Sequence, residues 1–227
     1  MTDWYKWHKK IHSSLVGRVL LGGLSGVYGA GVYLQGLSYR LGLSRKRRLP
    51  IPTICFGNLT AGGTGKTSAV LLAAEELAKG KFQPAILSRG YRRPRNEKEV
   101  VVLTEGREGS WETAGDEPWM LRQALRDLNV PVFVSPDRYK AGLLAAAHYH
   151  AKVALLDDGF QHHRLERDRD IVLLDAADPF AGGLLPLGLS REPRSALKRA
   201  SLRATCPSAS WMLISRSTTW MRACNRL

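Results

Sequence analysis

The feature that most constrains the fold is a glycine-rich stretch at residues 57–67, GNLTAGGTGKT. The apolar residues 51–56 before it predict a strand, and the apolar spacing in residues 68–79 predicts a helix that ends at Gly80. A glycine-rich loop between a strand and a helix is typical of a phosphate loop, in which backbone N–H groups and the positive helix end face phosphate oxygens. The general pattern has glycine at position 60, where this chain has Thr60. A glycine-rich turn with an exposed lysine is the less favoured alternative.

Two side chains at the end of this loop carry the expected chemistry. Lys66 would reach the β- and γ-phosphates of a nucleoside triphosphate, because a lysine at this position is the point charge that such loops use. Thr67 would place its hydroxyl on the Mg²⁺ that accompanies the triphosphate. The loop therefore predicts a site for a nucleoside triphosphate and Mg²⁺.

Beyond the loop, strand-like and helical segments alternate. We expect strands at 84–88, 100–103, 131–135, 153–156 and 171–174, and helices at 117–128 and 138–150. The last two strands are continuous apolar runs, as in parallel strands that are covered on both faces. The chain is therefore predicted to be an α/β protein of the P-loop NTPase type, with a doubly wound and mostly parallel sheet.

Acidic residues stand where ligands of such sheets bind. Asp157 and Asp158 directly follow the strand at 153–156, which predicts a second Mg²⁺-holding element opposite the loop. A solvated acidic turn is the alternative. Asp116 either caps the following helix or acts as general base for a substrate hydroxyl. His162 and His163 either contact a carboxylate or substrate, or belong to a hydrated turn.

The positive charge of the chain is concentrated at its ends. The formal net charge is +14, with nine basic residues against one acid in residues 1–48, four against none in 201–227, and 21 against 19 between them. A nucleic-acid-binding domain would carry the excess on its folded body, so no nucleic-acid partner is expected. Three cysteines without metal-ligand spacing predict neither a disulfide scaffold nor a zinc site.

The N-terminal part indicates contact with a membrane. Residues 19–39 contain no charged side chain, and basic and aromatic residues flank or interrupt this stretch. Its length could span a bilayer, but six glycines lower its hydropathy. We expect residues 1–48 to lie on an anionic membrane surface. A true span and an ordinary helix packed on the domain are the alternatives.

Seven motifs in order resemble the tetraacyldisaccharide 4′-kinases of lipid A synthesis. They are GNLTAGGTGKT (57–67), SRGY (88–91), GDEP (115–118), DRYK (137–140), DDGFQH (157–162), LERD (165–168) and LLPLGLSREPRSALKRA (184–200). That family has Thr or Ser at the position of Thr60. The resemblance implies transfer of the γ-phosphoryl group of ATP to the 4′-hydroxyl of a lipid A disaccharide 1-phosphate, with Mg²⁺. It also implies a peripheral or monotopic location at the cytoplasmic face of the bacterial inner membrane.

The resemblance also implies roles for single residues. The ATP phosphates would be bound by Thr60, Ala61, Gly62, Gly63, Thr64, Gly65, Lys66 and Thr67. The metal would be surrounded by Thr67, Asp157, Asp158 and Glu192. Asp116 matches the catalytic aspartate that deprotonates the hydroxyl, and Lys66 is the second catalytic residue.

After Ala200 the expected family pattern stops. Residues 201–227 contain no Asp, Glu, Lys or Gly, and only 211–214 form an apolar run. We therefore divide the chain into a membrane-associating segment (1–48), a P-loop kinase domain (49–200) and an atypical tail (201–227). We expect a frameshift or truncation, with the family's smaller second domain and the histidine partner of Asp116 missing. A short divergent paralogue, or an inactive nucleotide- or lipid-binding remnant, is the alternative.

Overall fold

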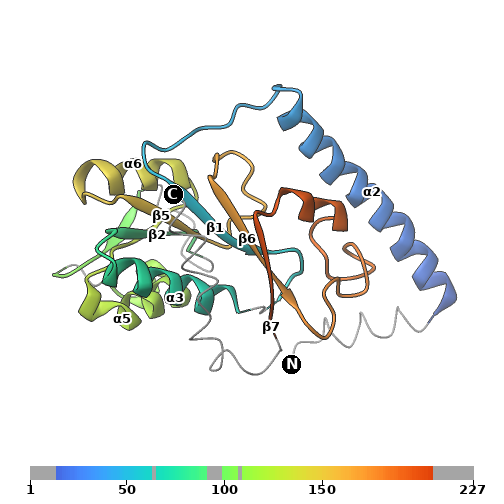
Figure 1. Ribbon diagram of the computed structural model, residues 1–227. Helices are drawn as coiled ribbons and strands as arrows, with labels where there is room; N and C mark the ends of the chain where they lie inside the picture. The colour runs from blue at the N-terminus through green and yellow to red at the C-terminus, as the bar shows by residue number, and fades with distance from the viewer. Residues whose placement is uncertain (1–13, 63–64, 91–98, 107–108, 207–227) are drawn as a thin grey trace.

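The computed structural model describes residues 14–62, 65–90, 99–106 and 109–206. A seven-stranded sheet with the order β3-β4-β2-β5-β1-β6-β7 forms its centre (Figure 1). The strands are β1 (Thr53–Asn58), β2 (Pro84–Ser88), β3 (Val101–Leu103), β4 (Val132–Val134), β5 (Val153–Asp157), β6 (Arg169–Asp175) and β7 (Leu202–Cys206). Every neighbouring pair is parallel except β3 with β4. The predicted doubly wound, mostly parallel sheet is confirmed.

Helices cover both faces of the sheet. The described α-helices are α2 (Leu15–Arg40), α3 (Lys66–Lys79), α4 (Trp111–Ala114), α5 (Asp116–Ala124) and α6 (Arg138–His148), and the 3₁₀ turns are η1 (Arg126–Leu128) and η2 (Arg194–Arg199). The helix expected over 117–128 is divided: α5 ends at Ala124 and η1 follows it.

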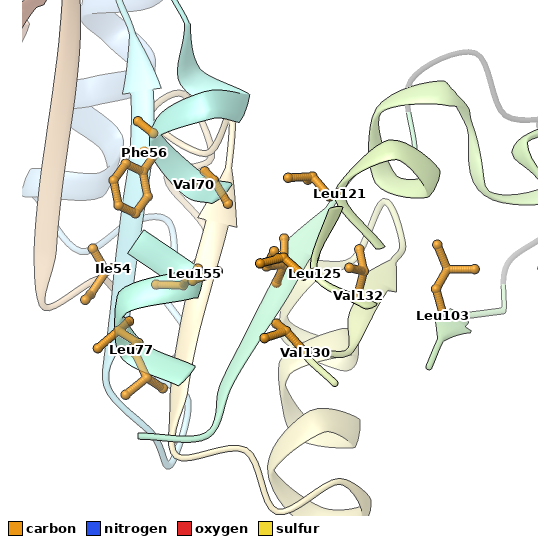
Figure 2. Packing of buried hydrophobic residues seen from close by; sticks show 14 of the residues in the cluster. Ile54, Phe56, Val70, Leu77, Leu103, Leu121, Leu125, Val130, Val132 and Leu155 are labelled. Atoms are coloured by element: carbon orange, nitrogen blue, oxygen red, sulfur yellow. The ribbon is translucent and has the colours of Figure 1, made fainter. Parts of the chain in front are cut away.

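Two hydrophobic cores follow from the alternation of side chains along the strands. Ile54 and Phe56 of β1 face α3 and α5, whose Val70 and Leu121 belong to the same cluster (Figure 2). Cys55, between them in the sequence, faces the opposite core with residues of α6 and η2. All five residues of β5 are buried, so the continuous apolar run is explained by cover on both faces.

The sheet continues beyond Ala200. β7 pairs in parallel with β6 from Ile171 opposite Leu202 to Asp175 opposite Cys206, and Leu202 packs against the first core. A strand was not expected here, because Leu202 is the only large apolar residue in this short segment at the sheet edge. The apolar run at 211–214 lies outside the described residues.

Candidate functional site

The phosphate loop joins β1 to α3, as the sequence predicts. Gly62 and Gly65 have φ values of 135° and 72°, in the region that favours glycine. Gly65 is the N-cap of α3, and in the described part of the chain no side chain caps this helix. The N–H groups of its first turn are therefore available to an anion. Gly63 and Thr64, also predicted to bind phosphate, lie outside the described residues.

Lys66 turns back over the loop that precedes it. Its Nζ donates a hydrogen bond to the Gly62 carbonyl at 3.3 Å and lies 3.8 Å from Oδ1 of Asp158. The side chain is only 11% exposed. The structure thus brings two predicted site residues together across the loop, with a buried positive charge against a carboxylate.

The carboxylates come from β5, the direct neighbour of β1. Phe56 of β1 lies opposite Asp157, the last residue of β5, and β1 continues to Asn58. Asp157 is buried, and this burial, followed by the charges of Glu117 and Asp158, raises its pKa to about 7. Asp158 has a φ of 49° and binds Nη1 of Arg191 at 2.9 Å. This left-handed backbone at a non-glycine residue turns the chain sharply at the end of the strand.

The oxygen atoms at this edge fit Mg²⁺. Asp158 Oδ1 is buried and accepts no hydrogen bond, and Asp157 is a buried carboxyl group whose pKa is raised chiefly by that burial. Thr67 lies in the first turn of α3, next to Lys66. In the described segments no three His, Cys, Asp or Glu side chains form a metal cluster. Proteins hold Mg²⁺ through one or two carboxylates together with substrate phosphates, and Asp157 and Asp158 are carboxylates of this kind.

Glu192 has a different partner in the structure. It is buried and forms two hydrogen bonds with Arg199, at 2.8 and 3.1 Å. Its role at the metal stays a prediction. The preceding residue, Arg191, contacts Asp158 and was not among the predicted site residues. Its position in the 184–200 motif, next to Glu192, could have identified it as a site residue.

Asp116 is the first residue of α5, and Gly115 is its N-cap. The capping alternative for Asp116 is therefore wrong. Its side chain is exposed, and the charge of the adjacent Glu117 acts on Asp157, which places this end of α5 toward the end of β5. Its role as general base stays a prediction.

The two histidines after the DDG turn are neutral at pH 7. Burial is the largest cause that lowers the pKa of both His162 and His163 to about 4, followed by Arg138 for His162 and Arg199 for His163. The His163 ring lies 5.5 Å from that of Tyr39. Neither histidine belongs to a metal cluster of the described residues.

The first half of the loop is held by a distant segment. The Ala61 N–H donates to the Leu189 carbonyl, and the Arg191 N–H donates to the Leu59 carbonyl. Thr60 forms an antiparallel bridge with Ser190. The 184–200 motif thus includes a short stretch, 189–191, that pairs with the loop backbone.

Comparisons with known proteins match this chain to a kinase family. The family model described as "Tetraacyldisaccharide-1-P 4′-kinase" matches residues 17–210, ten residues beyond the point where we expected the pattern to stop. The tetraacyldisaccharide 4′-kinase of Elusimicrobium minutum is 46% identical over 202 residues, which are 88% of this chain and 54% of that protein. The one from Pelobacter propionicus is 45% identical over 179 residues, 77% of this chain and 49% of that protein.

A solved structure has the same fold. The crystal structure of LpxK from Aquifex aeolicus in complex with ATP is 39% identical, with a TM-score of 0.75, and the match covers 83% of this chain and 58% of that chain. The chain spans about half the length of the curated relatives that it matches. With a family model over most of its length and with these identities, the chain belongs to the tetraacyldisaccharide 4′-kinase family.

Proposed function

We propose that this chain binds Mg·ATP and transfers the γ-phosphoryl group to the 4′-hydroxyl of a tetraacyldisaccharide 1-phosphate. The observation that carries the proposal is the pairing of Lys66, at the end of the loop after β1, with Asp158, the residue that follows β5. A P-loop kinase needs a positive charge on the β- and γ-phosphates and carboxylates at the metal, and the segments after these two strands supply both. Membership of the family supports the choice of acceptor.

The predicted site residues have separate roles in phosphate binding, metal binding and proton transfer. The loop from Thr60 to Thr67 binds the phosphates, and Lys66 stabilises the charge that develops on the transferred group. Thr67, Asp157 and Asp158 hold Mg²⁺, which neutralises phosphate charge when bound. Glu192 is assigned to the metal by the family pattern alone. Asp116 accepts the proton of the 4′-hydroxyl.

The outward face of α2 supports attachment to a membrane surface. Its exposed side chains include Leu15, Val16, Val19, Leu20, Leu24, Val27, Tyr33 and Leu34. Ser25, by contrast, is its one buried residue. The helix is long and apolar enough to cross a membrane by length and composition, and 6% of its most apolar window is buried. An apolar face turned away from the domain is expected for a helix in the lipid interface.

The location that follows is the cytoplasmic face of the bacterial inner membrane, with an anionic surface as partner. Arg18 and Arg40 lie near the two ends of α2, where their charges can meet lipid phosphates while the apolar side chains contact acyl chains. An enzyme placed in this way reaches the headgroup of its substrate without extracting the acyl chains.

Transfer of radiolabelled phosphate tests the proposal. The purified chain, in mixed micelles of detergent and tetraacyldisaccharide 1-phosphate, is incubated with Mg²⁺ and γ-labelled ATP. The proposal predicts a bisphosphorylated lipid with the label at the 4′ position. ATP binding without labelled lipid would instead make the chain a nucleotide-binding remnant of the family.

A further inference from the structure

The helix α2 contacts the nucleotide site through one intermediate turn. We define this turn as residues 184–191, the segment that precedes Glu192. In Figure 1, α2 lies along the side of the domain, beside the orange segment that contains the turn. The contacts are hydrogen bonds from two hydroxyl side chains of α2, Ser25 and Tyr28.

Ser25 fixes the first part of the turn. Its hydroxyl donates to the Leu184 carbonyl at 2.9 Å and accepts from the Leu187 N–H at 3.0 Å. Ser25 is 8% exposed, the only buried residue in a helix whose other side chains are partly or fully exposed. A Cβ at Gly29, one turn further along, would lie 3.0 Å from Cδ1 of Leu184, so the helix approaches the turn closely.

Tyr28 fixes the last residue of the turn. Its hydroxyl donates to the carbonyl of Arg191 at 2.8 Å. Burial, and then the charge of Glu192, raise the pKa of Tyr28, so the hydroxyl keeps the proton that it donates. Arg191 is thereby held by its carbonyl to α2 and by its N–H to Leu59 at the start of the phosphate loop.

The side chain of Arg191 completes the connection. Its Nη1 donates to Asp158 Oδ2 at 2.9 Å and lies 3.4 Å from Gln161 Oε1. Gln161 in turn donates from Nε2 to the Asn58 carbonyl at 2.9 Å, at the end of β1. One residue therefore links the helix, the loop backbone and a carboxylate of the metal site.

Hydrogen bonds hold the turn together and join it to the residues that precede it. Leu185 donates to the Ser190 carbonyl, Gly188 to Leu184, and Ser190 to Gly183. The Ser190 hydroxyl also donates to the Phe180 carbonyl at 2.7 Å. Ser25 and Tyr28 therefore hold the same bonded segment that carries Arg191.

We propose that Ser25 and Tyr28 are positioning residues for the nucleotide site, acting through the 184–191 turn on the phosphate loop and on Asp158. This inference rests on the proposed function, because it assumes that the loop binds Mg·ATP. It adds that the helix turned toward the lipid also sets the affinity for nucleotide. Seating of α2 and binding of Mg·ATP are then thermodynamically coupled, each favouring the other.

The test compares Tyr28→Phe and Ser25→Ala with the control Tyr33→Phe, all in the full chain in detergent micelles. Tyr33 is a tyrosine of the same helix that is 64% exposed. The measurements are the affinity for Mg·ATP from titration with a fluorescent ATP analogue, the KM for ATP, kcat at saturating ATP, and the melting temperature.

We expect each of the two variants to bind Mg·ATP about three- to tenfold more weakly, because Tyr28→Phe loses one hydrogen bond to the turn and Ser25→Ala loses two. The KM for ATP should rise by a similar factor, while kcat at saturating ATP and the KM for lipid stay within twofold, and Tyr33→Phe should equal wild type. A merely structural role would lower the melting temperature and leave nucleotide affinity unchanged.

The inference is overturned if both variants bind Mg·ATP as wild type does, and the proposed function would survive that result. If the wild-type chain binds no nucleotide at all, the proposed function fails first, and the inference fails with it. The two failures are therefore distinguishable in one experiment.

Discussion

Asp157 ends β5 as a buried carboxyl group whose pKa is raised to about 7, chiefly by burial and then by Glu117 and Asp158. Below about pH 4 the group is protonated in both the folded and the unfolded chain. Between about pH 4 and 7 the unfolded chain ionises while the folded protein keeps its proton, so the free energy of unfolding falls as pH rises. Above pH 7 the folded protein also ionises Asp157, and the loss in free energy of unfolding caused by burying this carboxylate is complete.

We therefore expect Asp157→Asn to raise the free energy of unfolding of the metal- and nucleotide-free protein at pH 8 by about 2 to 4 kcal/mol. At pH 4 the same change should have little effect. Urea unfolding at the two pH values measures the difference. The control is Asp127→Asn, at an exposed aspartate of η1, which should change neither value. An equal effect of Asp157→Asn at both pH values would contradict the assignment.

Gly57 shows how closely the elements of the site approach each other. A Cβ on this residue would overlap the Cβ of Phe160 and lie 3.0 Å from its backbone nitrogen. Phe160 belongs to the turn that follows Asp157 and Asp158. The contact therefore sets the distance between the phosphate loop and the carboxylates of Asp157 and Asp158.

Gly57→Ala is expected to lower the free energy of unfolding by about 1 to 3 kcal/mol, because neither backbone nor Cβ can move far in a packed core. The matched control is Gly31→Ala in α2, where a Cβ would have no atom within 4 Å and the helix propensity improves. Denaturant midpoints give the comparison. A Gly57→Ala protein as stable as wild type would show that β1 and the turn containing Phe160 are not in close contact at Gly57.

At the scale of single elements, α2 has two faces with separate tasks. Ser25 and Tyr28 bind the domain, while Leu20 and Leu24 are 64% and 57% exposed. If the outward face contacts lipid, charges placed there must oppose membrane binding without disturbing the nucleotide site.

The double variant Leu20→Glu/Leu24→Glu should lose most of its co-sedimentation with anionic vesicles and keep its affinity for Mg·ATP. Two buried apolar contacts are lost, and two negative charges meet an anionic surface. The control is Phe82→Glu/Met120→Glu, at two exposed apolar side chains outside α2. Unchanged sedimentation of the Leu20/Leu24 variant would refute the assignment of this face to lipid.

Across the whole molecule, the sequence predicted what local patterns determine. The strand at 84–88 was predicted with its observed bounds, and the buried run before Asp157 lies in the centre of the sheet because continuous apolar strands need cover on both faces. The loop glycines, Lys66 and the Asp157–Asp158 pair were recognisable because their residue types and their strand-to-helix setting are specific.

Contacts between distant segments were not predictable in this way. Arg191 lies far along the chain from Leu59 and Tyr28, and no local pattern pairs them. β7 was missed because Leu202–Cys206 is short, has little apolar character, and is a strand only through its pairing with β6. The contact of Glu192 with Arg199 also depends on the folded structure, because η2 places Arg199 beside Glu192.

Lys66 and the carboxylates after β5 are expected to form the phosphoryl-transfer site. The most direct measurement is the rate of 4′-phosphate transfer by Lys66→Ala beside Lys79→Ala, a lysine of the same helix that is 55% exposed and paired with Glu75. We predict at least a ~10²-fold loss of kcat for Lys66→Ala, because the developing phosphate charge loses its stabilising partner, with wild-type activity for Lys79→Ala and similar melting temperatures for both. Transfer by Lys66→Ala within twofold of wild type would contradict the account.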